Sequence, residues 1–146
     1  MDPVIVSALT ILALSQPTTV AYINDHHVAI VQKAVPNGAW GLYDPRARMI
    51  SLSPVTNDPA VLATILAHEG QHAVDIGTTL TTNRAGCEAT ENRAYASALQ
   101  TWQAIEAGPD APALDTPKDR EFAWYIDATA LLAPYMAHAE CAPFPV

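Results

Sequence analysis

Apolar residues in the middle of the chain recur every three or four positions, which is the spacing of one face of an α-helix. The pattern starts after Asn57-Asp58-Pro59, where Asp58 can cap the first free amides and Pro59 suits the first helical turn. It ends near Gly77, a residue type that often stops a helix. The apolar positions are Val61, Leu62, Ile65, Leu66, Ala73 and Ile76. We therefore predict a helix over residues 59–77.

Two more long helices are expected after the first one. Residues 84–107 form the second helix, and residues 117–137 form the third, which is kinked near Pro134. A loop at residues 78–82, which contains four threonines, joins the first two helices. The prolines support this division, because none lies within residues 60–108 and a proline inside a helix removes a hydrogen bond and distorts it.

The first part of the chain has a different pattern, with one helix, one short helical segment and three β-rich stretches. These elements cover residues 4–15, 18–24, 28–32, 40–43 and 49–52. The last two strands flank the turn signal Asp44-Pro45-Arg46-Ala47, so we expect them to form a hairpin. The whole chain, residues 1–146, is predicted to be one α+β domain in which a small antiparallel sheet of about three strands packs on helices.

Composition and charge exclude several kinds of protein. Half of the residues are apolar and 15% are charged, which is too apolar for a disordered chain. Seven basic and fifteen acidic residues give a net charge of −8, and the basic residues form no cluster, so we expect no nucleic-acid groove. The apolar stretch Val4–Leu14 is too short for a membrane helix, and no basic residue precedes it as in a secretory signal. We therefore expect no membrane contact and a cytoplasmic location.

The chain has two cysteines, Cys87 and Cys141, which are too few for a disulfide framework. In the reducing compartment expected here, the first interpretation is two free and partly buried thiols. One disulfide between them is the alternative, and the sequence leaves it open.

The segment His68-Glu69-Gly70-Gln71-His72 lies inside the first long helix and matches the H-E-x-x-H pattern. Two histidines four residues apart lie on one helix face, so both imidazoles can reach one metal ion. Glu69 is beside them and is placed to act as a general base on a metal-bound water. The simpler alternative is a pair of histidines on the solvent side of an amphipathic helix. Gly70 favours a site, since a glycine that weakens a helix indicates close approach of a neighbouring segment.

A catalytic zinc site usually has three protein ligands, so a third is needed. Glu91 lies in the middle of the apolar stripe of the second long helix, whereas Glu88 lies at its edge. A buried carboxylate needs a partner, and a zinc ion is a sufficient one. We predict one zinc ion bound by His68, His72 and Glu91, with Glu88 as an alternative third ligand. The alternative for Glu91 is a buried salt bridge to one of three arginines, Arg84, Arg93 or Arg120.

This pattern resembles the zincin metallopeptidases of the gluzincin type, in which a glutamate from a following helix completes the metal site. The interval from His72 to Glu91 is 19 residues, similar to that in compact members of the family. Residues 87–94 also look like the glutamate-x-arginine-alanine segment of one such group. The resemblance is to compact bacterial members called minigluzincins, and it covers residues 40–102. It implies zinc-dependent hydrolysis of peptide bonds by a fold with a short sheet and an active-site helix pair.

Asp75 follows the second histidine by three residues, on the metal side of the helix. Asp75 and Thr78 occupy the glycine and ligand positions of the metzincin pattern, so that related pattern is not met. Zinc-bound histidines usually donate their other ring N–H to a carboxylate or a carbonyl. Asp75 is a candidate for that role. Capping of the helix, a surface contact, or direct binding of the metal are its alternatives.

A peptidase also needs a donor for the oxyanion that forms when water attacks the carbonyl. Members of the family use a tyrosine or a histidine from later in the chain. We expect Tyr125 or His138 here, because the third long helix has to pack over the site in so short a chain, and Tyr95 and Tyr135 are the other candidates. For each of them, a core aromatic or a surface histidine is the simpler alternative.

The combined prediction is a zinc-dependent metallopeptidase that acts on a peptide or protein substrate, with a zinc-bound water activated by Glu69. Two other functions stay open: a non-catalytic zinc-binding interaction module of the same fold, and a helical binding protein without metal. The strand at 40–43 or the segment at 50–53 is the expected edge for an extended peptide. The apolar, proline-rich tail at residues 141–146 is a candidate to lie over the cleft. The sequence gives no oligomeric state.

Overall fold

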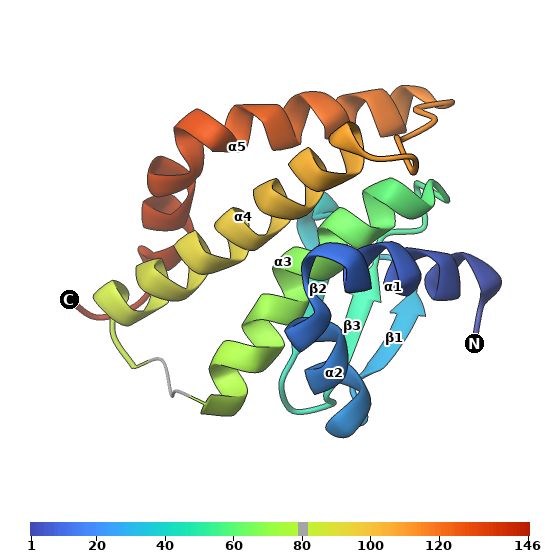
Figure 1. The fold of residues 1–146 in the computed structure, drawn as a ribbon. Coiled ribbons are helices and arrows are strands. Elements are labelled where there is room, and N and C mark those ends of the chain that lie inside the picture. The colour runs from blue at the N-terminus through green and yellow to red at the C-terminus, as the bar shows by residue number, and fades with distance from the viewer. Residues whose placement is uncertain (79–81) are drawn as a thin grey trace.

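A computed structural model describes residues 1–78 and 82–146 of the chain. The described residues form five α-helices, a short 3₁₀ helix and three β-strands (Figure 1). In chain order they are α1 (Pro3–Ser15), α2 (Pro17–Asp25), β1 (Ala29–Gln32), η1 (Pro36–Gly38), β2 (Gly41–Asp44), β3 (Met49–Leu52), α3 (Pro59–Thr78), α4 (Arg84–Ala107) and α5 (Pro117–Cys141). The α+β class is thus as predicted. Of the loop expected at 78–82, residues 79–81 lie outside the described residues.

The long helices begin where the sequence predicts. The Asp58 carboxylate caps α3 by accepting a hydrogen bond from the Ala60 amide at 2.9 Å. Thr116 and Asp119 form a capping box at the start of α5. This helix is longer than expected, since it ends at Cys141 and not near residue 137. It bends in its last part, and the bend returns its end to the start of α4 (Figure 1).

The three strands form a mixed sheet in the order β1-β3-β2. β2 and β3 form the predicted antiparallel hairpin, with Tyr43 opposite Ile50. β1 pairs in parallel with β3, with Ile30 opposite Ile50, so the prediction of an antiparallel sheet is wrong for this strand. The chain reverses twice between β1 and β3, and β3 lies between the other two strands. Two reversals return the chain to its first direction, which makes the β1–β3 pair parallel.

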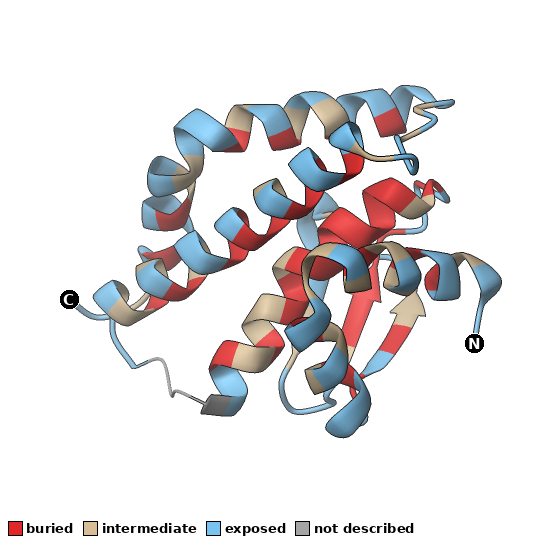
Figure 2. Ribbon diagram, viewed as in Figure 1, coloured by how far each residue is buried: buried red, intermediate tan, exposed pale blue. Residues whose placement is uncertain are grey.

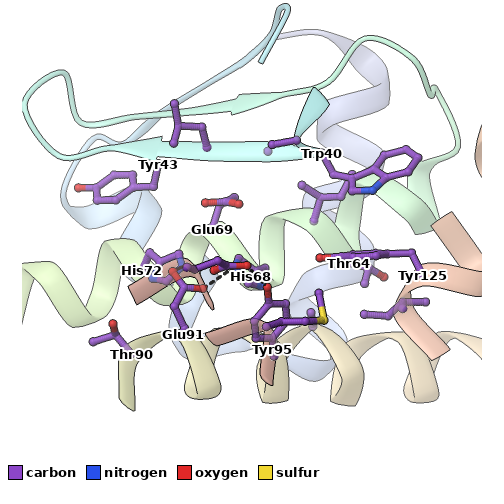
Figure 3. A pocket seen from close by; sticks show the side chains of 18 of the residues that line it. Trp40, Tyr43, Thr64, His68, Glu69, His72, Thr90, Glu91, Tyr95 and Tyr125 are labelled. Atoms are coloured by element: carbon purple, nitrogen blue, oxygen red, sulfur yellow. Dashed lines mark hydrogen bonds and ion pairs between the residues drawn. The ribbon is translucent and has the colours of Figure 1, made fainter. Parts of the chain in front are cut away.

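α3 is the central element of the fold. The sheet lies on one side of α3 and α4 lies on the other (Figure 3). α1 and α2 also pack on α3, while α5 covers α4. Val61, Leu62 and Leu66 of α3 are fully buried, and red buried positions line the faces of α3 and α4 that meet (Figure 2). Across residues 1–78 and 82–146, the structure has no helix with the length and hydropathy of a membrane span.

Cys87 of α4 and Cys141 of α5 form a disulfide, so the expectation of two free thiols is wrong. Their Cα atoms are 5.7 Å apart, within the usual range for such a bond. The pairing depends on α5 continuing beyond residue 137 to Cys141 and on its return to α4, which the local sequence pattern does not show. A disulfide also does not fit the reducing compartment that we expected for the two cysteines.

Candidate metal centre

Three side chains with metal-binding atoms converge between α3 and α4 (Figure 3). His68 and His72 lie one turn apart on α3, and Glu91 reaches them from α4. The His72 Nε2 atom is 3.1 Å from Glu91 Oε1, and the His68 Nε2 atom is 3.5 Å from Glu91 Oε2. One ligand atom from each residue lies within 4.8 Å of the other two. The structure therefore brings together the three residues that the sequence predicts as metal ligands.

The position of Glu91 around α4 explains why it, and not Glu88, reaches the histidines. Glu91 shares the buried stripe of α4 with Tyr95 and Trp102, and this stripe faces α3. Glu88 lies on another side of α4, where its Oε1 atom is 2.7 Å from Nδ1 of His138. The helical phase thus selects the carboxylate of the two that lies close to both histidines.

The arginines that we considered as partners of Glu91 have other contacts. Arg93 binds Asp75, with its Nε atom 3.0 Å from Oδ2. Arg84 and Arg120 donate to backbone carbonyl groups near the two ends of α5. Within the described ranges, the charged groups that contact Glu91 as ion pairs are the two imidazoles, so the structure does not support the salt-bridge alternative.

The site fits a divalent metal ion by its own chemistry. Glu91 Oε2 is buried and makes no well-formed hydrogen bond among the described residues; His68 Nε2 lies 3.5 Å from it. A buried carboxylate oxygen in that state needs a compensating charge. Two imidazole nitrogens and one carboxylate oxygen are zinc ligands, and ligand atoms around a tetrahedral zinc ion lie about 3.3 Å apart. The two imidazoles approach different oxygens of Glu91, at 3.1 and 3.5 Å, and one ligand atom from each of the three residues lies within 4.8 Å of the others, so small side-chain shifts would bring all three to one ion.

The pKa shifts of Glu91 and His72 also favour the binding of a metal ion. Burial alone would raise the pKa of the Glu91 carboxyl, but hydrogen bonds from His68 and His72 hold that pKa well below its usual value. Burial would lower the pKa of the His72 imidazole, but the hydrogen bond and charge of Glu91 outweigh it and raise this pKa. Glu91 is therefore ionised, as a metal ligand has to be, and metal binding would compete with protonation of His72.

Glu69 is next to His68 in the sequence. Its side chain points away from Glu91 and α4, toward β2 on the other side of α3 (Figure 3). Its side chain is buried, with 8% of the residue exposed. Burial raises the pKa of Glu69, and the charges of His68 and His72 only partly offset this effect. The backbone N–H of Tyr43 donates to its carboxylate. The carboxylate is therefore held between the metal ligands and the edge strand.

Gly41 of β2 is a site residue that the sequence analysis missed. A Cβ atom at this position would lie 2.6 Å from Ile65 Cγ2 and 2.9 Å from Glu69 Cγ, which is closer than side chains tolerate. Only glycine lets β2 approach α3 so closely that Glu69 fits beneath it. A signal was present, since a glycine inside a predicted strand often marks close approach of another segment.

Gly70 has a different role from the one its place in the motif suggests. A Cβ atom at Gly70 would lie 2.6 Å from Cγ2 of Thr19 in α2. A neighbouring segment does approach closely here, as expected. That segment is α2, and neither residue lines the cavity beside the ligands. Gly70 therefore serves the packing of α2 on α3.

Asp75 is buried near the ligands, with 7% of the residue exposed. It accepts a hydrogen bond from Gln71 Nε2 at 3.2 Å and forms the ion pair with Arg93. Its charge contributes to the raised pKa of His72. Asp75 thus links α3 to α4 beside the ligands, and its role as partner of a histidine N–H stays a prediction.

Two of the four candidate oxyanion donors line the cavity, namely Tyr125 of α5 and Tyr95 of α4. Tyr95 donates its hydroxyl hydrogen to Glu140, and its pKa is raised by burial and by that hydrogen bond. Burial and a hydrogen bond to the Glu91 carboxylate raise the pKa of Glu140 to about 7. The side chain of His138 is 70% exposed on the surface, and Tyr135 is also exposed, so the structure does not bring either to the site.

A cavity of about 830 Å³ adjoins the ligands. β2 forms one wall, and Glu69, His68 and His72 lie on the α3 side. The wall from α5 is largely apolar, and the tail after α5 reaches the cavity through its Phe144 side chain. A space of this size has room for part of a peptide.

A scan against protein-family models, a search of curated proteins and a search of solved structures found no match for this chain.

Proposed function

We propose that this chain is a zinc-dependent metallopeptidase of the gluzincin type, with a zincin-like arrangement of the sheet and the helix pair. One observation carries the proposal. The ligand atoms of His68, His72 and Glu91 lie within 4.8 Å of one another, and the buried Glu69 lines the same cavity of about 830 Å³. A structural zinc site has four protein ligands and is closed, whereas three ligands at a cavity are typical of a catalytic one.

Each side chain has a defined task in this proposal. A zinc ion held by His68, His72 and Glu91 would make a water molecule more acidic and polarise the scissile carbonyl group. Glu69 would take a proton from the attacking water and pass it to the leaving amine, as a general base and then a general acid. Tyr125 would donate a hydrogen bond to the oxyanion from across the cavity.

The proposed substrate is an extended segment of a peptide or protein. β2 is an edge strand of the sheet, and its residues 41–43 line the cavity above Glu69. An edge strand can take up an extended peptide through main-chain hydrogen bonds, which places the peptide bond between β2 and the metal ligands. The apolar wall from α5 favours an apolar side chain next to the cleaved bond.

The Glu69→Gln variant tests the catalytic role. We expect it to bind one zinc ion per chain, as the wild type does, and to lose hydrolysis of a mixed peptide library. Zinc is measured in the purified protein by elemental analysis, and cleavage is measured by mass spectrometry. Glu106→Gln, an exposed carboxylate on α4, is the matched control and should retain both properties.

Two outcomes would contradict the proposal. A wild-type protein that takes up no stoichiometric zinc or other divalent metal would exclude the metal centre. A wild-type protein that binds zinc but cleaves no peptide in the library would favour the interaction module, in which Glu69 has no chemical task.

A further inference from the structure

The end of α5 returns to the metal centre and forms part of its cavity. Glu140 and Phe144 line the cavity together with Met136. This segment is fixed at several points. Cys141 is bonded to Cys87, which lies one turn before Glu91 on α4. The Arg84 side chain donates to the Ala142 carbonyl at 2.9 Å, and the Arg84 amide donates to the Pro145 carbonyl at 2.7 Å.

Glu140 connects to a metal ligand through Tyr95. The Tyr95 hydroxyl donates a hydrogen bond to Glu140 Oε1. The Tyr95 ring meets the His68 ring edge-on, with 4.8 Å between the ring centres (Figure 3). Tyr95 is 4% exposed, and its hydroxyl has hydrogen-bond partners in the Glu140 carboxylate and the Tyr125 hydroxyl. The hydrogen bond to Glu140 therefore helps to fix the Tyr95 ring, and the ring limits the rotation of the His68 imidazole.

We propose that Glu140 is a positioning residue of the metal centre, which holds Tyr95 against His68 and so orients that imidazole for metal binding. This inference rests on the proposed metal site. Partners outside the ligand set fix the ring orientation of metal-bound histidines in general. Here the ring contact of a tyrosine does so, and the disulfide at Cys141 holds the carboxylate that fixes the tyrosine.

Two other roles for Glu140 make different predictions. It also has a hydrogen bond to Glu91, and through that contact it would act on the ligand directly. It would also strengthen metal binding simply by its negative charge. It is not part of the group of ligand atoms found among the described residues, which consists of His68, His72 and Glu91.

The experiment measures zinc affinity by competition with a chromophoric chelator, on the full chain with its disulfide formed. We expect Glu140→Ala to weaken zinc binding by about 10–100-fold, the usual effect of losing such a partner. Glu140→Gln should stay within about threefold of the wild type, because its amide oxygen accepts the same hydrogen bond. Glu121→Ala is the control, since Glu121 lies on the same helix and pairs with Lys118 at the surface.

A double-mutant cycle with Tyr95→Phe shows the route of the effect. This variant keeps the ring but loses the hydroxyl, so it should weaken zinc binding as Glu140→Ala does. The double variant should be no weaker than either single one, because both remove the same link. Circular dichroism of each metal-free variant checks that it is folded. If Glu140→Ala is not folded, the zinc affinity of Glu140→Gln still provides a result.

Distinct results would overturn the inference. Losses that add in the double variant would show that Glu140 acts on Glu91 directly. An equal loss in Glu140→Gln and Glu140→Ala would show an effect of charge, and an unchanged affinity in Glu140→Ala would show no role. Each of these leaves the proposed function intact. A wild-type chain that does not bind zinc would overturn both.

Discussion

Replacement of both cysteines by serine is expected to destabilise the protein substantially. The disulfide joins residues 54 positions apart, and the chain-entropy relation for a closed loop of that length gives about 4 kcal/mol at 25 °C. The loop contains most of α4 and nearly all of α5, which gain freedom in the unfolded chain when the bond is absent. A domain of this size has a free energy of unfolding of about 5–15 kcal/mol, so the expected loss is a large part of the total.

Urea unfolding followed by tryptophan fluorescence measures this loss, because Trp102 of α4 is buried in the core at 1% exposure. The Cys87→Ser/Cys141→Ser variant is compared with the oxidised wild type, and both are then measured with a phosphine reductant. The reduced wild type should fall to the free energy of unfolding of the variant. The variant itself should not respond to the reductant, which makes it the control for other effects of that reagent.

A difference below about 1 kcal/mol between the oxidised wild type and the variant would contradict this reasoning. It would show that strain in the folded state, or residual structure in the unfolded chain, offsets the loop-entropy effect of the disulfide. A loss in the variant without a matching loss in the reduced wild type would assign the effect to the serine side chains instead.

Three other changes have distinct expected outcomes. Gly41→Ala introduces a Cβ atom 2.9 Å from Glu69 Cγ, and this overpacking costs about 1–3 kcal/mol. The rate of peptide hydrolysis should fall while the zinc content is kept, and an unchanged rate would contradict the close fit. Tyr125→Phe should lower kcat by about 10²–10³-fold at similar KM, whereas an effect on KM alone would assign Tyr125 to substrate binding. Burial raises the pKa of Glu69 above its usual 4.5, so the folded state binds this proton more tightly and the metal-free wild type loses stability as pH rises above that value. Metal-free Glu69→Gln should therefore be more stable than the wild type at about pH 7 and equally stable below about pH 4. Urea unfolding with a chelator present measures both stabilities, and equal stability at both pH values would be evidence against the raised pKa.

The helices that carry the ligands could be predicted because their signals are local. Asp58 and Pro59 mark the start of α3, and a spacing of four residues places His68 and His72 on one face. Glu91 was found from its angle around α4, an inference that holds over short distances along a straight, proline-free helix. Each of these steps needs only the geometry of a single helix.

The oxyanion donor shows where such reasoning ends. Tyr125 and His138 were expected together because α5 has to cover the site, and α5 does form a wall of the cavity. The two residues are thirteen positions apart, which is about 220° around an α-helix, so they point in widely different directions. His138 accordingly lies against Glu88 at the surface while Tyr125 lines the cavity. The phase of α5 would have separated them, although the bend of this helix makes such a projection less accurate beyond Pro134.

The features that the sequence did not show all depend on two elements meeting. The parallel β1–β3 pair requires the order of the strands, and the Cys87–Cys141 bond requires the return of α5. Glu140 lies beyond the predicted end of that helix at residue 137, and nothing in its neighbours along the chain links it to Tyr95. The H-E-x-x-H motif and Glu91 define a site that can hold a metal, but the rotation of the His68 ring depends on contacts that only the tertiary structure supplies. Substitutions at Tyr95 and Glu140 therefore examine how the fold tunes the metal site, while substitutions at His68 and His72 examine only whether a metal site exists.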